Sequence, residues 1–359
     1  MARAFRGTSK KKSPGPDGIG PLAIACVYGW DPHRIEALIR AHIRLGIHPD
    51  RWKIARGVTI TKPGKDDYSL AKSYQCISLL NCLGKMVEKV TAMMVSAHCE
   101  AVRGLHPGHY GCRAQRSAVH AVGVTIAQAQ EAWGRDCIVG ALLMDVAAAF
   151  PSVARGCLLR KMRRAGLDEC LVKWTDSFMR DRKVIMSVDG QDGEPVSVTT
   201  GLPQGSPISP VLFAHYVAEI HGAVEDQVED SRGISFVDDV TWIVEGTDIS
   251  DVASKPERCA AASLRWADEN VVRFEASKTE TILFSKRRKH KRCRREIQMG
   301  PHRARPNPGA TRWLGIWLDA SFKLAENRKR RIGKKRQAEA RLRRVVNQYG
   351  VPPVAARNL

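Results

Sequence analysis

The sequence has no apolar run of about 18 or more residues, which excludes a membrane-spanning helix of ordinary length. Its start lacks the apolar stretch of a secretory signal. Its ten cysteines include no C-x-x-C pair, which argues against a zinc knuckle, and a chain of 359 residues is too long for a small disulfide scaffold. We therefore expect an intracellular protein in a reducing compartment that does not enter a membrane.

The composition is that of a folded protein with a large core. Hydrophobic residues make up 43% of the chain and charged residues 26%, so wholesale disorder is excluded. No internal repeat and no clean linker interrupts residues 1–285. The sequence therefore favours one large enzyme with subdomains over several independent domains.

Positive charge is concentrated at one end of the chain. The net charge is +21, and residues 286–359 contain 23 Lys and Arg against 4 Asp and Glu. The densest runs are residues 286–295 and 328–336. Such a block favours binding to the phosphate backbone of a nucleic acid. The alternative interpretations are a solvated face, a disordered tail or a nuclear-import signal.

Hydrophobic periodicity predicts the main elements. Residues 54–61 alternate as a strand does, and the nearly continuous apolar run at 137–144 predicts a strand buried on both faces. Residues 184–188 and 195–199 form a plausible hairpin. Helical spacing predicts helices at residues 32–45, 83–102, 118–133, 209–224 and 325–346. In the second of these helices, we expect the inward side chains to be Met86, Val87, Val90, Met93 and Met94.

Three aspartates follow or separate short apolar strands. Asp145 ends the buried strand, and Asp238 and Asp239 lie between the strands predicted at 234–237 and 240–244. Adjacent carboxylates repel, and their burial is costly unless a cation compensates. Three carboxylates suit Mg²⁺, and two such ions about 3.5–4 Å apart would clamp the oxygens of a phosphoryl transfer. The alternative is an ordinary polar turn and an unrelated strand-end Asp.

Several motifs in fixed order resemble the core of reverse transcriptases. The main ones are DVAAAF at 145–150, GLPQGSPISP at 201–210 and FVDD at 236–239. The resemblance is closest to the polymerases of non-LTR (LINE-like) retrotransposons and spans about residues 12–320. The other segments that resemble this family are KSPGPDG at 12–18, WK at 52–53, KPGK at 62–65, SYQCISLLN at 73–81, LGKMVE at 83–88, SKTE at 277–280 and WLGIWLD at 313–319.

The resemblance implies a role for each motif. Asp145, Asp238 and Asp239 would be catalytic and would hold two Mg²⁺ ions, for which Mn²⁺ could substitute. Phe150 would be the steric gate beneath the incoming sugar, or else a core aromatic. Lys278 would approach the phosphates of the nucleotide, or else be a surface lysine.

Further binding residues are implied in the same way. Gln204 and Gly205 would line the nucleotide and template pocket. The alternative is that this segment is a turn that only caps the next helix. Lys65 would also bind nucleotide. Residues 313–318 would form the hairpin that grips the primer end, with Trp313, Leu314 and Gly315 as the primer grip, or else a plain amphipathic strand.

The architecture implied by the family is an α+β right-hand polymerase with an antiparallel palm sheet backed by helices. We expect a reverse transcriptase domain at residues 1–320, with about 1–135 mainly fingers and 136–320 mainly palm. Residues 321–359 would form a basic, incomplete thumb. The implied partners are an RNA template, a DNA primer and deoxynucleoside triphosphates, and the implied location is the nucleus. We expect the chain to be a fragment or a decayed copy of a longer element.

Departures from the family pattern leave a second hypothesis open. Gln75 and Cys76 replace the usual Arg-Pro, and a neutral Gln cannot pair with a triphosphate as Arg does. Ala147-Ala148 and Pro151 also depart from the usual residues. The alternative is a catalytically impaired remnant that binds nucleic acid through its basic C-terminal region. A host-adopted or intron-encoded polymerase relative is a third hypothesis.

Overall fold

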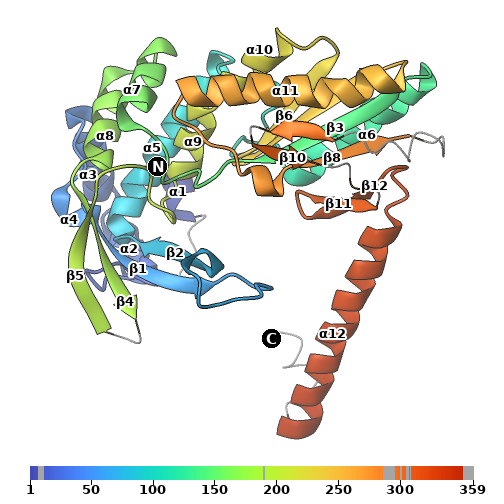
Figure 1. The fold of residues 1–359 in the computed structure, drawn as a ribbon. Coiled ribbons are helices and arrows are strands. Elements are labelled where there is room, and N and C mark those ends of the chain that lie inside the picture. Colours follow the sequence, from blue (N-terminus) through green and yellow to red (C-terminus); the bar gives the residue numbers. More distant parts are fainter. Residues whose placement is uncertain are drawn as a thin grey trace.

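Two four-stranded sheets organise the chain (Figure 1). The computed structural model describes residues 1–6, 12–188, 191–285, 296–299, 301–304, 307 and 309–350. The basic run predicted to bind phosphates at 286–295 lies outside the described residues, as does the end of the predicted thumb after residue 350. The α+β class expected from the sequence is confirmed.

The first sheet joins segments that are far apart in the sequence. Its strand order is β2-β1-β4-β5, and its strands are β1 (Ile54–Thr61), β2 (Tyr74–Leu79), β4 (Arg182–Val188) and β5 (Gln191–Val198). Strand β1 pairs antiparallel with β2 and parallel with β4. The predicted strand at 54–61 is confirmed, and the hairpin predicted near residue 190 is confirmed with longer strands.

The second sheet is antiparallel throughout and carries the core. Its order is β6-β7-β3-β8, with strands β3 (Ile138–Asp145), β6 (Ser231–Phe236), β7 (Asp239–Gly246) and β8 (Glu280–Phe284). Helix α11 (Ile249–Glu269) packs on β3 and β7, and helix α6 (Ala118–Gly134) packs against β3. The side chains of β3 are buried on both faces, as its apolar run predicts.

The remaining helices surround the two sheets. Helix α3 shows how local sequence sets an element: the Asp31 side chain accepts a hydrogen bond from the Arg34 amide, and Gly46 ends the helix in the left-handed region (φ +68°). The helices not yet given are α1 (Ala2–Arg6), α2 (Pro21–Trp30), α3 (Pro32–Leu45), α4 (Asp50–Lys53), α5 (Cys82–Ala101), α7 (Arg155–Arg164) and α8 (Glu169–Met179).

Two expectations about helices are wrong. The predicted helix at 209–224 is two helices, α9 (Ser209–Tyr216) and α10 (Ile220–Glu225). The buried Lys161 ammonium donates to the Tyr216 carbonyl at 2.9 Å and pairs with Glu219, so this carbonyl accepts a side chain at the point where the helix breaks. In α5, Met93 and Met94 are exposed instead of inward.

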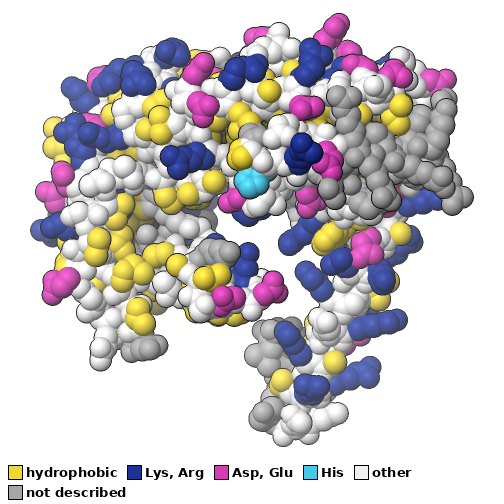
Figure 2. All heavy atoms as spheres, in the orientation of Figure 1, with side chains coloured by type: hydrophobic (Ala, Val, Ile, Leu, Met, Phe, Trp, Pro, Cys, Tyr) yellow, Lys and Arg dark blue, Asp and Glu magenta, His cyan; other side chains and the backbone are white. Residues whose placement is uncertain are grey.

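The C-terminal part of the described chain projects from the body. Two short hairpins, formed by strands β9 (Ile297–Met299), β10 (His302–Ala304), β11 (Ala310–Trp313) and β12 (Ile316–Asp319), precede helix α12 (Ala325–Tyr349). Helix α12 points away from the second sheet, and an open hollow separates it from the lobe that holds the first sheet (Figures 1 and 2). Among the described helices, none combines the length and apolarity that crossing a membrane requires.

Candidate active site

The three aspartates meet at one end of the second sheet. Asp145 is the last residue of β3, and its Cα is paired in register with that of Asp239, the first residue of β7. Asp238 lies in the turn between β6 and β7, and its carbonyl accepts a hydrogen bond from the Val146 amide at 2.9 Å. The fold therefore brings together the three carboxylates that the sequence singled out.

Burial makes this cluster electrostatically unfavourable without a cation. Burial, with the negative charges of Asp238 and Asp145 adding to it, raises the pKa of Asp239 to about 6. Burial also raises the pKa of Asp238, and the Asp145 carboxylate contributes to that shift. The described chain supplies only partial compensation, since Lys278 opposes both shifts. Oxygen donors that are partly desolvated and mutually repelling suit a hard divalent cation.

Lys278 forms an ion pair with Asp145. It lies in the short 3₁₀ helix η2 (Ala276–Lys278), and the Glu275 amide fixes this segment by donating to the Asp145 carbonyl at 2.8 Å. The hydrogen bond to Asp145 raises the pKa of Lys278. The lysine predicted to contact a nucleotide therefore lies at the aspartate cluster, where it partly neutralises one carboxylate.

The turn that carries Asp238 is held in an unusual conformation. Val237 has φ +59°, a left-handed value that is costly for a β-branched residue. Gly111 packs against it so closely that a Cβ there would lie 2.5 Å from the Val237 amide nitrogen. The Tyr110 amide donates to the Ser235 carbonyl at 2.8 Å. A loop far away in the sequence thus supports the strained turn.

Phe150 is half-buried beside the segment that begins at Gly201. Its ring makes an edge contact with Phe213 at 5.8 Å between centroids, and its carbonyl accepts from the Leu202 amide at 2.7 Å. Gly201 has φ +82°, and a Cβ there would lie 2.4 Å from the Pro151 carbonyl oxygen. Pro151, a departure from the family pattern, is thus accommodated by a glycine.

Gln204 and Gly205 contact the first sheet. The Ser78 amide in β2 donates to the Gln204 carbonyl at 2.8 Å. Gly205 has φ +117°, and a Cβ there would lie 2.6 Å from the Ser78 carbonyl oxygen. Only glycine fits this approach without strain.

Sequence reasoning missed one link in this loop. The hydroxyl of Ser206 donates to the fully buried Glu88 carboxyl, whose pKa is raised by burial. Both residues lie inside motifs of the family resemblance. Their pairing could not be predicted because it spans 118 residues.

The other predicted residues lie in different surroundings. Lys65 is exposed in the turn between β1 and β2. Trp313 is 4% exposed and belongs to the apolar cluster between α6 and β8, while Leu314 is half-buried and Gly315 is exposed. Leu314 and Gly315 have φ +46° and +81°, the pattern of a two-residue hairpin turn. The hairpin predicted at 313–318 is confirmed.

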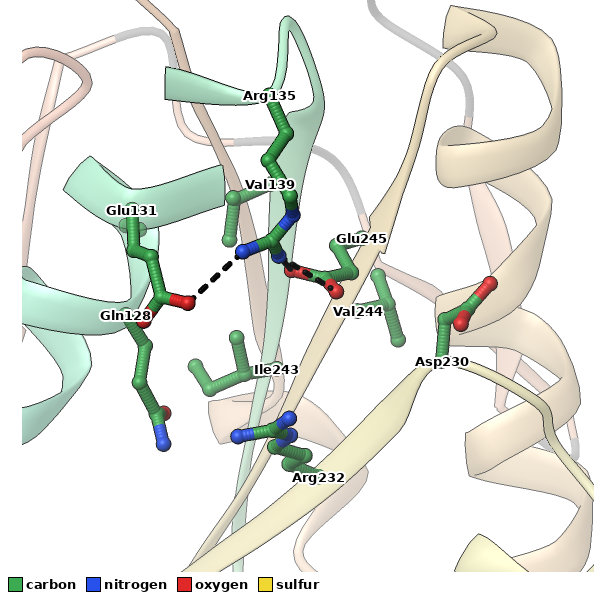
Figure 3. A pocket seen from close by; sticks show the side chains of 10 residues that line it. Gln128, Glu131, Arg135, Val139, Asp230, Arg232, Ile243, Val244 and Glu245 are labelled. Atoms are coloured by element: carbon green, nitrogen blue, oxygen red, sulfur yellow. Dashed lines mark hydrogen bonds and ion pairs between the residues drawn. The ribbon is translucent and has the colours of Figure 1, made fainter. Parts of the chain in front are cut away.

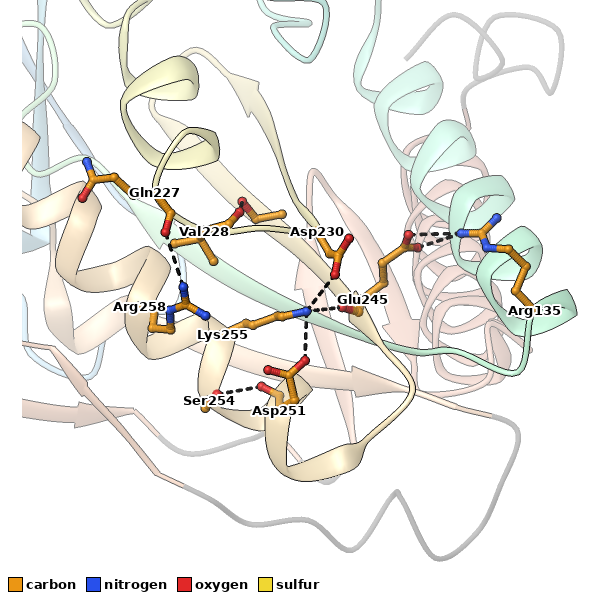
Figure 4. Close-up of polar contacts among 10 residues, drawn as sticks. Arg135, Gln227, Val228, Asp230, Glu245, Asp251, Ser254, Lys255 and Arg258 are labelled. Atoms are coloured by element: carbon orange, nitrogen blue, oxygen red, sulfur yellow. Dashed lines mark hydrogen bonds and ion pairs between the residues drawn. The ribbon is translucent and has the colours of Figure 1, made fainter.

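A large cavity lies at the opposite end of the second sheet. It is about 360 Å³ and is bordered by Val139 and Glu245, about 20 Å along β3 from Asp145 at the usual strand rise (Figure 3). There Arg135 bridges Glu131 and Glu245. The buried Lys255 ties α11 to the same end through Asp230 and the Glu245 carbonyl, and it also pairs with Asp251 of its own helix (Figure 4). These contacts stabilise the sheet.

Comparisons with known proteins identify the family of this chain. The sequence matches the family described as "Reverse transcriptase (RNA-dependent DNA polymerase)" over residues 60–318. It is 27% identical over 281 residues to the RNA-directed DNA polymerase from mobile element jockey of Drosophila melanogaster, covering 77% of this chain and 30% of that protein. It is 26% identical over 322 residues to the probable RNA-directed DNA polymerase from transposon X-element of the same species, covering 89% and 34%.

A third relative and a solved structure complete the comparison. The chain is 27% identical over 278 residues to a putative 115 kDa protein in the type-1 retrotransposable element R1DM of Drosophila melanogaster, covering 76% and 26%. The chain thus spans about a third of the length of these relatives. Its fold matches apo telomerase from Candida tropicalis, truncated from its C-terminal domain, with a TM-score of 0.51 at 10% identity, covering 84% of this chain and 59% of that one.

Proposed function

Because the chain belongs to the reverse transcriptase family, we propose that it is the polymerase part of a non-LTR retrotransposon protein. The proposed reaction is the attack of a primer 3′-hydroxyl on the α-phosphate of a deoxynucleotide, directed by an RNA template, with pyrophosphate leaving. The observation that carries this proposal is the convergence of Asp145, Asp238 and Asp239 at one sheet end with raised pKa values for the last two.

The donor set fits divalent metal ions, which reverse transcriptases generally use. All three donors are carboxylates, the ligands that Mg²⁺ prefers. We assign two Mg²⁺ ions to Asp145, Asp238 and Asp239, with Mn²⁺ as a substitute. When bound, such ions neutralise negative charge on the transferring phosphoryl group and the attacking oxygen.

The chain's own residues would position the substrates. Lys278 can leave Asp145 for the triphosphate of the nucleotide, because it is an exposed, flexible ammonium within reach of the cluster. Phe150 is placed five residues after Asp145 and is fixed by Leu202, so its ring can exclude a 2′-hydroxyl. Gln204 and Gly205 would contact the nucleotide and template from the side of the first sheet, together with Lys65.

The domain arrangement follows from the two sheets. We assign the first sheet to the fingers, including β4 and β5, which the expected boundary near residue 135 would place in the palm. We assign the second sheet to the palm and α12 to a basic, incomplete thumb. The β11–β12 hairpin with Trp313, Leu314 and Gly315 would be the primer grip, in which the buried Trp313 anchors the turn and Gly315 faces the primer. RNA template and DNA primer would then occupy the hollow that separates α12 from the fingers.

A second candidate function is nucleic-acid binding without polymerisation. It is favoured by Gln75, a half-buried residue of β2 at the position where the family resemblance implies an Arg that would bind the triphosphate. Restoring the charge with Gln75→Arg separates the two functions. If Gln75→Arg increases nucleotide affinity and extension rate, the chain is a working polymerase that is weakened by having Gln at this position. If neither the parent nor the variant extends a primer, nucleic-acid binding is the function that remains.

The direct experiment for the polymerase is primer extension on an RNA template with Mg²⁺ and deoxynucleotides. We expect extension by the parent chain and none by an Asp238→Ala, Asp239→Ala double variant. Retained RNA binding by that variant would show that it is folded. Equal extension by both proteins would contradict the proposal.

A further inference from the structure

Three potential metal ligands meet on the outer side of the second sheet, away from the aspartates. His106 comes from the loop between α5 and α6, and His221 and Glu225 come from α10. One donor atom from each lies within 4.8 Å of the other two. Among the described residues, this group meets that spacing and the aspartate triad does not. The neighbouring strand, β6, is an edge strand of the sheet.

His221 is fully buried and has an unused ring nitrogen. Its Nε2 is 2.9 Å from the Ser235 hydroxyl, which in turn is 2.6 Å from Nδ1 of His109. Its Nδ1 is buried without a hydrogen-bond partner and faces Gly233, where a Cβ would lie 2.3 Å from it. If Nε2 carries the proton and donates to Ser235, Nδ1 presents a bare lone pair. An unsatisfied buried acceptor destabilises the fold, and a coordinate bond would remove that cost.

The other two ligands are oriented by backbone amides. The Gly108 amide donates to Nδ1 of His106 at 3.1 Å, so the neutral ring carries its proton on Nε2, which donates to the Glu225 Oε2 at 3.1 Å in the metal-free chain. The second Glu225 oxygen accepts from the Gly233 amide at 2.7 Å. A bond to the far oxygen of a carboxylate ligand is the usual support of a metal site, whereas His106 must release the Gly108 amide and carry its proton on Nδ1 before Nε2 can bind an ion.

The charge states also suit a cation. Burial lowers the pKa of His221 well below its usual value, with His106 and His109 adding to the shift, so its ring is neutral at pH 7. Burial acts to raise the pKa of Glu225, but hydrogen bonds from His106 and Gly233 outweigh it and lower the pKa overall. Neutral imidazole and ionised carboxylate are the ligating forms.

We propose that His106, His221 and Glu225 bind a zinc ion. Two imidazole nitrogens and one carboxylate oxygen are a known zinc set with a fourth position left for water, whereas Mg²⁺ prefers oxygen alone. His106 and Glu225 line a cavity of about 310 Å³, which gives the ion a path and the water a place. Arg232 lines the same cavity and opposes a cation, so affinity depends on the three short coordinate bonds.

Binding requires one local movement. The rings of His106 and His221 are stacked 4.4 Å apart at 17°, so their in-plane lone pairs cannot both point at one ion. Two ligands of tetrahedral zinc are about 3.4 Å apart, closer than the 4.8 Å limit that these donors meet. His106 is the partly exposed ring and lies in a loop, so it is the one that turns.

The bound ion would join the 106–111 loop and α10 beside β6. This loop already pairs with β6, because the Ser235 amide donates to the Gly108 carbonyl at 3.0 Å. Ser235 is three residues before Asp238. The zinc site would therefore stabilise the hairpin that carries two of the catalytic aspartates, and it is independent of whether the chain polymerises DNA.

Metal binding to the full chain tests the proposal. Metal-free protein is titrated with Zn²⁺ and, separately, with Co²⁺, whose visible absorption reports tetrahedral nitrogen and oxygen ligands. We expect the parent to bind one zinc ion per chain with high affinity and to show a raised Tm when zinc is bound. An Asp238→Asn, Asp239→Asn variant should keep the zinc binding and the rise in Tm, because the zinc site and the aspartate cluster are separate. His33→Gln, on exposed α3, is the matched control and should also bind like the parent.

His106→Gln and Glu225→Gln change partly exposed ligands and are expected to leave the fold intact, as circular dichroism would verify. Each should weaken zinc binding by about tenfold or more, remove the Co²⁺ absorption and abolish the zinc-dependent rise in Tm. The proposal is overturned if the parent binds no zinc, or if these variants bind it as tightly as His33→Gln does.

Discussion

Asp239 illustrates how a residue suited to metal binding weakens the metal-free fold. Its pKa of about 6 means that the folded chain holds this proton more tightly than the unfolded chain does. The contribution of Asp239 to stability is therefore most favourable below its unfolded pKa, near 4, and is lost as the pH rises through about 6. At neutral pH the charged carboxylate opposes folding.

Replacing this carboxylate should stabilise the metal-free protein. For Asp239→Asn at pH 7.5 without divalent cations, we expect the free energy of unfolding to rise by about 1–3 kcal/mol. The difference from the parent should vanish near pH 4 and shrink when Mg²⁺ is added, because Mg²⁺ stabilises only the parent's carboxylate. Denaturant titrations of both proteins measure this. A variant less stable than the parent at pH 7.5 would contradict it.

The ion pair of Lys278 with Asp145 would compete with a metal ion for this carboxylate. Lys278→Gln should therefore increase the affinity of the nucleotide-free site for Mn²⁺, since it removes a positive charge that contacts a ligand. The same variant should raise the KM for deoxynucleotides. Electron paramagnetic resonance of free Mn²⁺ measures the first effect, and Lys278→Arg is the control that keeps the charge. Weaker Mn²⁺ binding in Lys278→Gln would be inconsistent with this role.

At the scale of elements, the segment that follows Gly201 couples the two sheets. It contacts Phe150, close to Asp145, at one end and Ser78 of β2 at the other. Its anchor is the buried hydrogen bond between Ser206 and Glu88 of α5. We therefore expect a displacement of β2 to affect the site that would hold the nucleotide.

Gly205→Ala tests this coupling. The added Cβ would approach the Ser78 carbonyl oxygen and the backbone has φ +117°, so we expect a decrease of about 1–3 kcal/mol in stability and a raised KM for nucleotide. Gly123→Ala is the matched control. Gly123 lies in α6 with nothing within 4 Å of its Cβ position, so the change should be neutral or stabilising. Equal effects of the two substitutions would disprove the close approach of Gly205 to β2.

Elements whose pattern is local could be predicted from the sequence. The strands β1, β3 and β7 were readable because each is a continuous apolar or alternating run. The helix break after Tyr216 could not be predicted, because it depends on a tertiary hydrogen bond from Lys161 of α7. The parallel pairing of β1 with β4 was equally hidden, since no local signal records a partner more than 100 residues away. The three aspartates could be predicted because they lie in motifs that occur in a fixed order along the sequence. His106, His221 and Glu225 lie in no such motif.

At the scale of the whole molecule, positively charged side chains are concentrated along α12. This helix carries ten Lys and Arg against two Glu, and its described side chains are mostly exposed. Arg330 is also exposed, but it stacks over Trp317 at 3.8 Å, which links the start of the helix to the β11–β12 hairpin, and it pairs with Glu326 of its own helix. The rest of the helix is free to face a polyanion in the hollow.

Neutralising one turn of this helix should weaken nucleic-acid binding uniformly. For a Lys334→Gln, Lys335→Gln, Arg336→Gln variant, we expect lower affinity for a primer–template duplex of any sequence. The slope of log affinity against log salt concentration should fall by roughly 0.7–0.9 for each phosphate that the variant no longer neutralises. Fluorescence anisotropy at several salt concentrations measures both quantities. An unchanged salt slope would mean that α12 does not bind the duplex.

If the three aspartates at the sheet end form the active centre of an RNA-directed DNA polymerase, polymerisation must depend on their negative charge. The most direct measurement is extension of a labelled DNA primer on an RNA template with Mg²⁺, comparing the parent with Asp239→Asn. We predict extension by the parent alone, although the variant is the more stable protein without metal. Extension by Asp239→Asn at the parent's rate would contradict this assignment.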